Sequence, residues 1–463
     1  MSSTSTNLSG NGLHHVNVGG VQGRVRAGSP NPDEETGLLS PKSPGGLPGD
    51  NNRNATVLST ALLQIADVVG VGFLTLPTAV SKLGWIPGMT LLVLLCPVNI
   101  YAGILISNAR NLVPGARNYV EMARNTTGSR GFTSSVACLY YSYMVLTLAS
   151  YLLAISKVLS MVFWEVDLCR PTWGMISILC LLPLVQMRRL NASKSLLWGN
   201  SAMITVSVLL ALVYMYLHMG EQNVKTELFA SKLTWIDTCG AISSFTFAYL
   251  GVYIFLEMIE EMKEPKRFPE TFLISGPTQL ALYVSVAGVG YAYLGAGAHM
   301  MVVDAIPQDS LLHRISTLCL FFYLLVAYLV KSIILTRAVM TWIFNKRGSK
   351  KRSLGKIRLY WFVISLLIAL LNFVLANAIP VFDNVVSILG SAQSSLLGYV
   401  LPSLFVIFAR KKADVSTSPL EKIAFTGMLL FGMFIFFVGT TANLVTIQRS
   451  YTAGNTPFAC YPD

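Results

Sequence analysis

The stretch ADVVGVGFLTLPTAV, Ala66 to Val80, lies in the first long apolar segment of this 463-residue chain. It carries an aspartate, a Gly-Val-Gly triplet and a proline, and a helix that only crosses a bilayer needs none of these. Glycine lowers helix propensity by about 1 kcal/mol and lets a ligand approach the backbone. The stretch therefore predicts a helix that is interrupted inside the membrane, at a candidate binding site.

Apolar segments long enough to cross a bilayer as helices follow one another along the rest of the chain. The composition is 53% hydrophobic and 12% charged, about half the charged fraction of a soluble domain. Long, uniformly apolar runs predict helices and not barrel strands, so we expect an all-α integral membrane protein. The eleven expected transmembrane helices are residues 57–80, 85–109, 133–163, 172–187, 196–219, 238–261, 272–296, 312–344, 358–378, 384–409 and 420–447.

The predicted helices define the domain organisation. Residues 1–54, rich in Ser, Gly, Asn and Pro, are expected to be a disordered cytosolic tail. Residues 55–409 form a ten-helix core, with helices 1–5 in 57–219 and helices 6–10 in 238–409. Residues 420–447 form a peripheral eleventh helix, and residues 448–463 a short non-cytosolic tail.

The net charge of +12 comes from lysines and arginines in the short segments between apolar runs. With a cytosolic N-terminus, 21 of them fall in inside segments and six in outside segments, which is the bias typical of membrane proteins. This placement argues against a nucleic-acid partner and makes the lipid bilayer the expected environment.

A second interruption is predicted in helix 6, where FAYLGVY, Phe247 to Tyr253, contains Gly251. Gly70 and Gly251 are each the fourteenth residue of their expected helix, and these two helices are five positions apart in chain order. Matched glycine-interrupted helices in two halves indicate an inverted-repeat transporter. Unwound turns expose peptide groups, and the half-helix after Gly72 adds a positive dipole end, so a zwitterion suits the site. The alternative is that these glycines are helix-packing contacts.

Three ionisable residues, Asp67, Glu257 and Lys331, lie well inside apolar segments and are candidates for function. Asp67 and Lys331 have similar expected depths and are predicted to form an ion pair, one member of which titrates during transport. Alternatively, Lys331 extends to the cytosolic interface. Glu257 is either a gate or proton site, or a cap for the basic loop with Lys263 and Arg267, and we favour the cap.

Cysteines are few and scattered, with Cys169 and Cys460 both expected at the outer face. A disulfide between them is one prediction, and three unpaired thiols, at Cys169, Cys239 and Cys460, are the other. No metal-ligating cluster, phosphate-binding loop or nucleophile–base pair occurs in the sequence, so we expect neither an enzyme nor a cofactor.

Four segments resemble the amino acid/auxin permease family of the APC superfamily. VVGVGFLTLPTAVSKLGWIPG (68–88) resembles its first helix, and FAYLGVYIFLEMIEEMKEP (247–265) resembles its sixth. GVGYAYLG (288–295) is similar to its seventh helix and SILGSAQSSLLGYVLPSLF (387–405) to its tenth. The resemblance covers about residues 55 to 447.

This resemblance implies a LeuT-like fold, which is a five-plus-five inverted repeat, plus one extra helix. By position, the substrate carboxylate would be held by Gly70, Val71 and Gly72, and the binding site lined by Phe247, Ala248, Tyr249 and Gly251. Tyr253 is a further lining candidate. Ala66 replaces the asparagine of the sodium-coupled branch, which together with Lys331 argues against sodium.

Together these features predict a proton-coupled amino acid symporter that works by alternating access. The alternatives are sodium-coupled or uncoupled transport, and a non-transporting amino-acid sensor. The expected partners are an amino acid and a coupling proton, and the expected assembly is a monomer. The expected location is the plasma membrane or a vacuolar or endolysosomal membrane.

Overall fold

Helices make up almost all of the computed structural model, which describes residues 55–68, 70–186, 194–218, 224–231, 233–295, 301–346, 354–378, 382–452 and 458. Nine helices in this part of the chain are long and apolar enough to cross a membrane. Val57–Val68 and Gly72–Leu83 form a further bent pair at 53°, and the apolar helix Arg170–Val185 is shorter. The fold class is confirmed, while the count of eleven spans stays a prediction. The predicted tail 1–54 lies outside the described residues.

The first half of the predicted core corresponds to seven helices and one 3-10 segment. In chain order they are α2 (Val57–Val68), η2 (Val71–Thr75), α3 (Leu76–Leu83), α4 (Trp85–Leu112), α5 (Tyr119–Thr127), α6 (Arg130–Val162), α7 (Arg170–Val185) and α8 (Lys194–Leu217). Helix α5 was not expected from the sequence. It begins after Asn118, whose side chain accepts a hydrogen bond from Glu121 N, and ends at Gly128 with a φ of 65°.

The second half begins with the broken sixth span, formed by α9 (Trp235–Ala248), η3 (Val252–Ile254) and α10 (Phe255–Glu261). After it come η4 (Pro265–Thr271), α11 (Phe272–Leu294), η6 (Val302–Ala305), α12 (Leu311–Lys346) and α13 (Leu354–Ala378). The last spans are α14 (Phe382–Leu389) to α15 (Leu401–Lys412), and α16 (Pro419–Phe434) to α17 (Thr440–Thr452), each joined through π-helical turns. Helix α17 therefore extends past the predicted end at residue 447.

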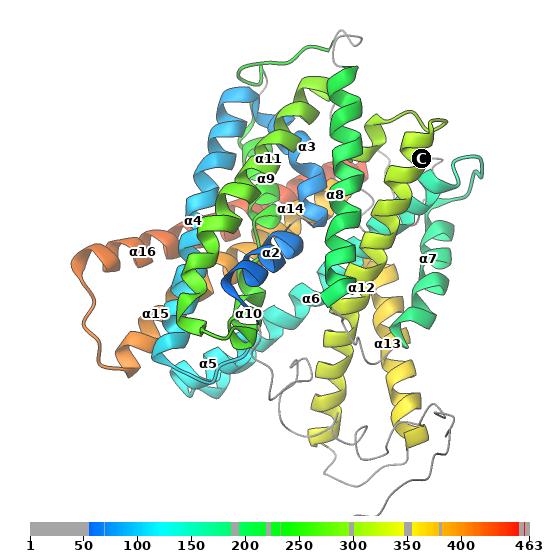
Figure 1. Ribbon diagram of the computed structural model, residues 1–463. Coiled ribbons are helices and arrows are strands. Elements are labelled where there is room, and N and C mark those ends of the chain that lie inside the picture. The colour runs from blue at the N-terminus through cyan, green and yellow to red at the C-terminus, as the bar shows by residue number, and fades with distance from the viewer. Residues whose placement is uncertain are drawn as a thin grey trace, which may run out of the picture. The chain divides into compact units, whose positions relative to one another are not determined.

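Both predicted interruptions are present. Helix α2 ends at Val68, and α3 starts only at Leu76 with Pro77 in its first turn, where a missing N–H costs no helical bond. Helix α9 ends at Ala248, and regular α-helix resumes at Phe255. Figure 1 shows α2 and α3 in blue near α9 and α10 in green.

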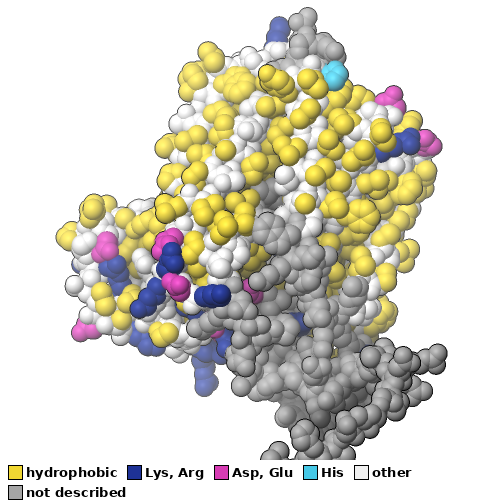
Figure 2. All heavy atoms as spheres, viewed as in Figure 1, with side chains coloured by type: hydrophobic (Ala, Val, Ile, Leu, Met, Phe, Trp, Pro, Cys, Tyr) yellow, Lys and Arg dark blue, Asp and Glu magenta, His cyan; other side chains and the backbone are white. Residues whose placement is uncertain are grey.

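The surface agrees with a membrane environment. Hydrophobic side chains cover much of the face drawn in Figure 2, whereas Lys and Arg gather near the end where α5 and α15 lie. At that end the Lys412 ammonium donates a hydrogen bond to the Asn125 carbonyl oxygen at 2.5 Å. This contact joins two segments that were expected on the same, cytosolic side.

Candidate functional site

The two interrupted spans meet at their breaks. A Cβ atom added to Gly72 would lie 2.7 Å from Phe247 Cδ1 and 2.9 Å from Ala248 Cα. Reciprocally, a Cβ atom on Gly251 would lie 2.7 Å from Val68 Cγ2. Real Cβ atoms do not approach other atoms so closely. Glycine at position 72 therefore lets the backbones of the two spans touch, and glycine at position 251 makes room for the Val68 side chain. Gly72 and Gly251 therefore act at least as packing contacts between the broken spans.

Tyr283 of α11 ties the two breaks together. Its hydroxyl lies 3.0 Å from the Val68 carbonyl oxygen and 2.5 Å from that of Ala248, and it donates its hydrogen between them. These carbonyls belong to the last residues of α2 and α9, where helical N–H partners are missing. Its ring packs on Tyr249 with 4.9 Å between ring centroids. The sequence analysis did not single out this residue; a tyrosine inside an apolar helix, which needs a hydrogen-bond partner, was the available signal.

Gly70 faces a group of buried tyrosines. A Cβ atom on Gly70 would lie 3.5 Å from the Tyr151 hydroxyl and 3.6 Å from the Tyr323 hydroxyl, which are ordinary contact distances. The rings of Tyr143 and Tyr253 are 5.1 Å apart. We call Tyr143, Tyr151, Tyr253 and Tyr323 the tyrosine cluster; α6, η3 and α12 contribute its members. Of the four, only Tyr253 was predicted.

Lys331 of α12 points into the tyrosine cluster. Its ammonium donates a hydrogen bond to the Tyr151 hydroxyl at 3.3 Å. The ammonium also lies 4.8 Å from the centroid of the Tyr151 ring and 5.7 Å from that of the Tyr253 ring, within the range of cation–π attraction. These contacts contradict the alternative in which Lys331 extends to the cytosolic interface.

Asp67 lies near Lys331 without pairing with it. The two charges interact electrostatically, but no ion pair of 4.0 Å or less joins Asp67 to a described basic residue. The predicted ion pair is therefore wrong for this structure, because the Lys331 ammonium is turned onto the faces of two tyrosine rings. Both residues remain half-buried.

The other residues predicted to line the binding site lie outside the tyrosine cluster. The Tyr249 hydroxyl donates to the Leu92 carbonyl oxygen of α4 at 2.9 Å, so the tyrosine is directed at α4. Phe247 contacts Gly72, and Ala248 contributes its backbone to the meeting point of the spans. The side chain of Val71 lies outside the described residues.

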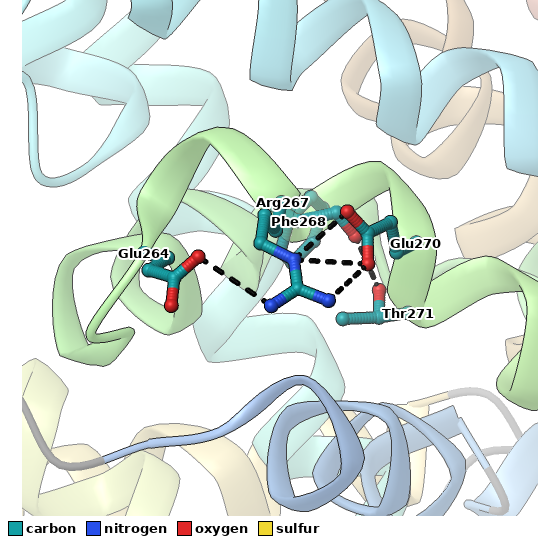
Figure 3. A network of polar contacts seen from close by, with 5 residues as sticks. All are labelled: Glu264, Arg267, Phe268, Glu270 and Thr271. Atoms are coloured by element: carbon teal, nitrogen blue, oxygen red, sulfur yellow. Dashed lines mark hydrogen bonds and ion pairs between the residues drawn. The ribbon is translucent and has the colours of Figure 1, made fainter.

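Glu257 of α10 does not cap the basic loop, contrary to the favoured expectation. Arg267 instead contacts Glu264 at 3.4 Å and Glu270 at 2.8 Å, all within or next to η4 (Figure 3). Glu257 accepts a hydrogen bond from the Tyr140 hydroxyl of α6 at 3.4 Å. Among the described residues it makes no ion pair, since α10 directs it toward α6 and away from η4.

Comparison with known proteins identifies the family. The family model described as "Transmembrane amino acid transporter protein" matches residues 53–445, most of the chain. The protein belongs to this transmembrane amino acid transporter family. Among its relatives are "Amino acid transporter AVT1E" of Arabidopsis thaliana, 25% identical over 79% of this chain and 70% of that protein. The Arabidopsis "Amino acid transporter AVT1J" is 23% identical over 88% of this chain and 93% of that protein.

A solved structure has the same fold. The structure titled "Crystal structure of MhsT in complex with L-phenylalanine" is 14% identical, with a TM-score of 0.55, and covers 86% of this chain and 98% of that one. This likeness confirms the LeuT-like fold. The family membership makes the chain a multi-pass amino acid transporter and not an enzyme.

Ion pairs connect separate elements of this transporter. Lys157 of α6 contacts Asp304 of η6 at 2.6 Å. Arg110 at the end of α4 pairs with Glu260 of α10. The Lys157–Asp304 pair joins residues that are 147 positions apart in the chain.

The transporter also contains a disulfide at Cys169, the residue before α7. Its predicted partner, Cys460, lies outside the described residues, so the pairing stays a prediction. Phe458 packs on the ring of Phe373 at 6.2 Å, and Phe373 in turn contacts Gly174 of α7. This chain of contacts places a residue two positions before Cys460 near the helix that follows Cys169.

Proposed function

We propose that this transporter is a proton-coupled amino acid symporter whose substrate binds where the two broken spans meet. The observation that carries the proposal is the contact of Gly72 with Ala248 and of Gly251 with Val68, beside the tyrosine cluster. The ends of α2 and α9 converge there, and such ends hold the charged groups of substrates in transporters with broken helices.

Glu257 is the proposed proton site. It is a half-buried carboxyl group inside a span, and its hydrogen-bond partner among the described residues is the Tyr140 hydroxyl. An uncompensated charge in the membrane is costly, and binding a proton removes that cost. Proton binding would favour the loaded, closed state. Rocking of the broken spans would then open the site to the other side.

Sodium is not required in this proposal. Ala66 stands where the sodium-coupled branch of the resembled family has an asparagine, and a lysine ammonium already occupies the neighbourhood of the breaks. The N-terminus is proposed to be cytosolic, on the side where the basic residues of α5 and α15 gather. The membrane is proposed to be the plasma membrane or that of an acidic vacuole or endolysosome, and the protein to act as a monomer.

The test is uptake of radiolabelled amino acids by proteoliposomes under an imposed pH gradient. We expect the gradient to drive accumulation, and replacement of sodium by choline to change nothing. Glu257→Gln should abolish gradient-driven accumulation while exchange of internal for external substrate continues. The matched control is Glu260→Gln, one turn away and paired with Arg110, which should keep accumulation per folded molecule. Sodium-dependent uptake would contradict the proposal, and so would binding without any accumulation, which would indicate a sensor.

A further inference from the structure

Two opposite charges stand beside the helix breaks, and neither forms an ion pair with a described residue. No described residue forms a hydrogen bond or an ion pair with the Asp67 carboxylate. The Lys331 ammonium uses one of its three donors on the Tyr151 hydroxyl. Both groups therefore keep free hydrogen-bonding capacity. Both side chains are only half-buried.

Lys331 is held in place by its neighbours, and Asp67 lies within electrostatic range of it. Asp67 lies on α2, three residues before Gly70, in the electrostatic neighbourhood of Tyr143, Tyr151 and Tyr323. Lys331 is held over tyrosine rings and is separated from Asp67 by more than an ion-pair distance. Charges inside a protein cost energy unless they are paired. Two opposite charges that do not reach each other can both be paired by a ligand that carries one positive and one negative group.

We propose that Asp67 and Lys331 form a clamp for the zwitterionic part of the substrate. The Asp67 carboxylate binds the α-ammonium group, and the Lys331 ammonium binds the α-carboxylate. This inference rests on the proposed function and deepens it, because it replaces recognition by peptide groups alone with recognition by two side-chain charges. The clamp predicts that the substrates are α-amino acids with uncharged side chains. Asp67 and Lys331 compensate the two charges of the substrate's zwitterionic part, and the surrounding tyrosine cluster offers rings and hydroxyls to its side chain.

Ligand analogues test the clamp on the purified full-length protein in nanodiscs. The probes are L-alanine, L-leucine and L-phenylalanine, each with its decarboxylated amine and its deaminated acid. For the unsubstituted protein, we expect at least one of the amino acids to bind more than about tenfold tighter than its amine and its acid. Amine or acid binding as tight as that of the parent amino acid would overturn the clamp without any variant being needed.

The variants Lys331→Met and Asp67→Asn then assign the two ends. Lys331→Met should weaken binding of the amino acid about tenfold or more and leave the amine, which lacks the carboxylate, unchanged. Asp67→Asn should weaken the amino acid similarly and leave the acid unchanged. The matched control is Lys157→Met, which removes a lysine from the Asp304 pair and should affect all three ligands equally. Lys331→Arg and Asp67→Glu keep the charges and should retain part of the affinity.

Two results would overturn the clamp. One is an equal loss, or no loss, for amino acid, amine and acid in both variants, which is the pattern of a purely structural role. The other is binding and uptake restricted to amino acids with charged side chains, which would leave the transporter function standing. Failure of every amino acid to be taken up would instead refute the proposed function itself.

Discussion

Gly70 and Gly72 are only two residues apart, yet the structure predicts opposite consequences for the same substitution. In Gly72→Ala the new methyl group would lie 2.7 Å from Phe247 Cδ1, 2.9 Å from Ala248 Cα and 3.1 Å from Ala248 N. Two of these atoms are backbone and cannot move without displacing α9. Overpacking of this kind costs about 1–3 kcal/mol.

Gly70→Ala meets no such obstacle. The nearest atoms to its methyl group are the Asp67 carbonyl oxygen and the Tyr151 hydroxyl, both at 3.5 Å. The φ of Gly70 is −117°, which alanine adopts without strain. The stability should therefore change little. The methyl group would, however, occupy space between the break and the tyrosine hydroxyls, where the substrate is proposed to bind.

Thermal unfolding and uptake of the two variants provide the assay. We expect Gly72→Ala to lower the free energy of unfolding by about 1–3 kcal/mol. We expect Gly70→Ala to keep the stability and to lower uptake about tenfold or more, the effect of one methyl group in a fitted site. An unchanged stability for Gly72→Ala, or undiminished uptake for Gly70→Ala, would refute this reasoning about the breaks.

Three further predictions follow from single contacts. Tyr283→Phe removes a donor shared by two helix-end carbonyls and should cost about 1–3 kcal/mol in thermal or denaturant unfolding; unchanged stability would argue against the bridge. Glu260→Gln leaves the buried Arg110 without its partner and should cost about 3–5 kcal/mol. Addition of Arg110→Gln should recover part of this loss, and no recovery would contradict a coupled pair. Cys169→Ser and Cys460→Ser should destabilise equally, with no further loss in the double variant; additive losses would argue against their pairing.

Local patterns in the sequence were sufficient for much of the fold. The lengths of the apolar segments predicted all the helical segments that the structure describes as spans, and the predicted ends lie within a few residues of the observed ones. Length is informative because the bilayer requires about 20 apolar residues per helix. The interruption at Gly70 was also readable, because glycine and a following proline weaken a helix wherever they occur. Helix α5 was missed because it is too short and polar to resemble a span.

The sequence by itself determined the interrupted membrane helices and the presence of charges within them, because helix propensity and hydrophobic length depend on neighbouring residues. Only the tertiary structure decided that Lys331 contacts Tyr151, 180 positions earlier in the chain, and that no described residue pairs with Asp67 beside it. The role of Tyr283 as the bridge between the breaks follows only from the packing of α11 against them. Such convergence depends on how helices pack together, and a window of sequence contains no information on which side chains will face each other across the bundle.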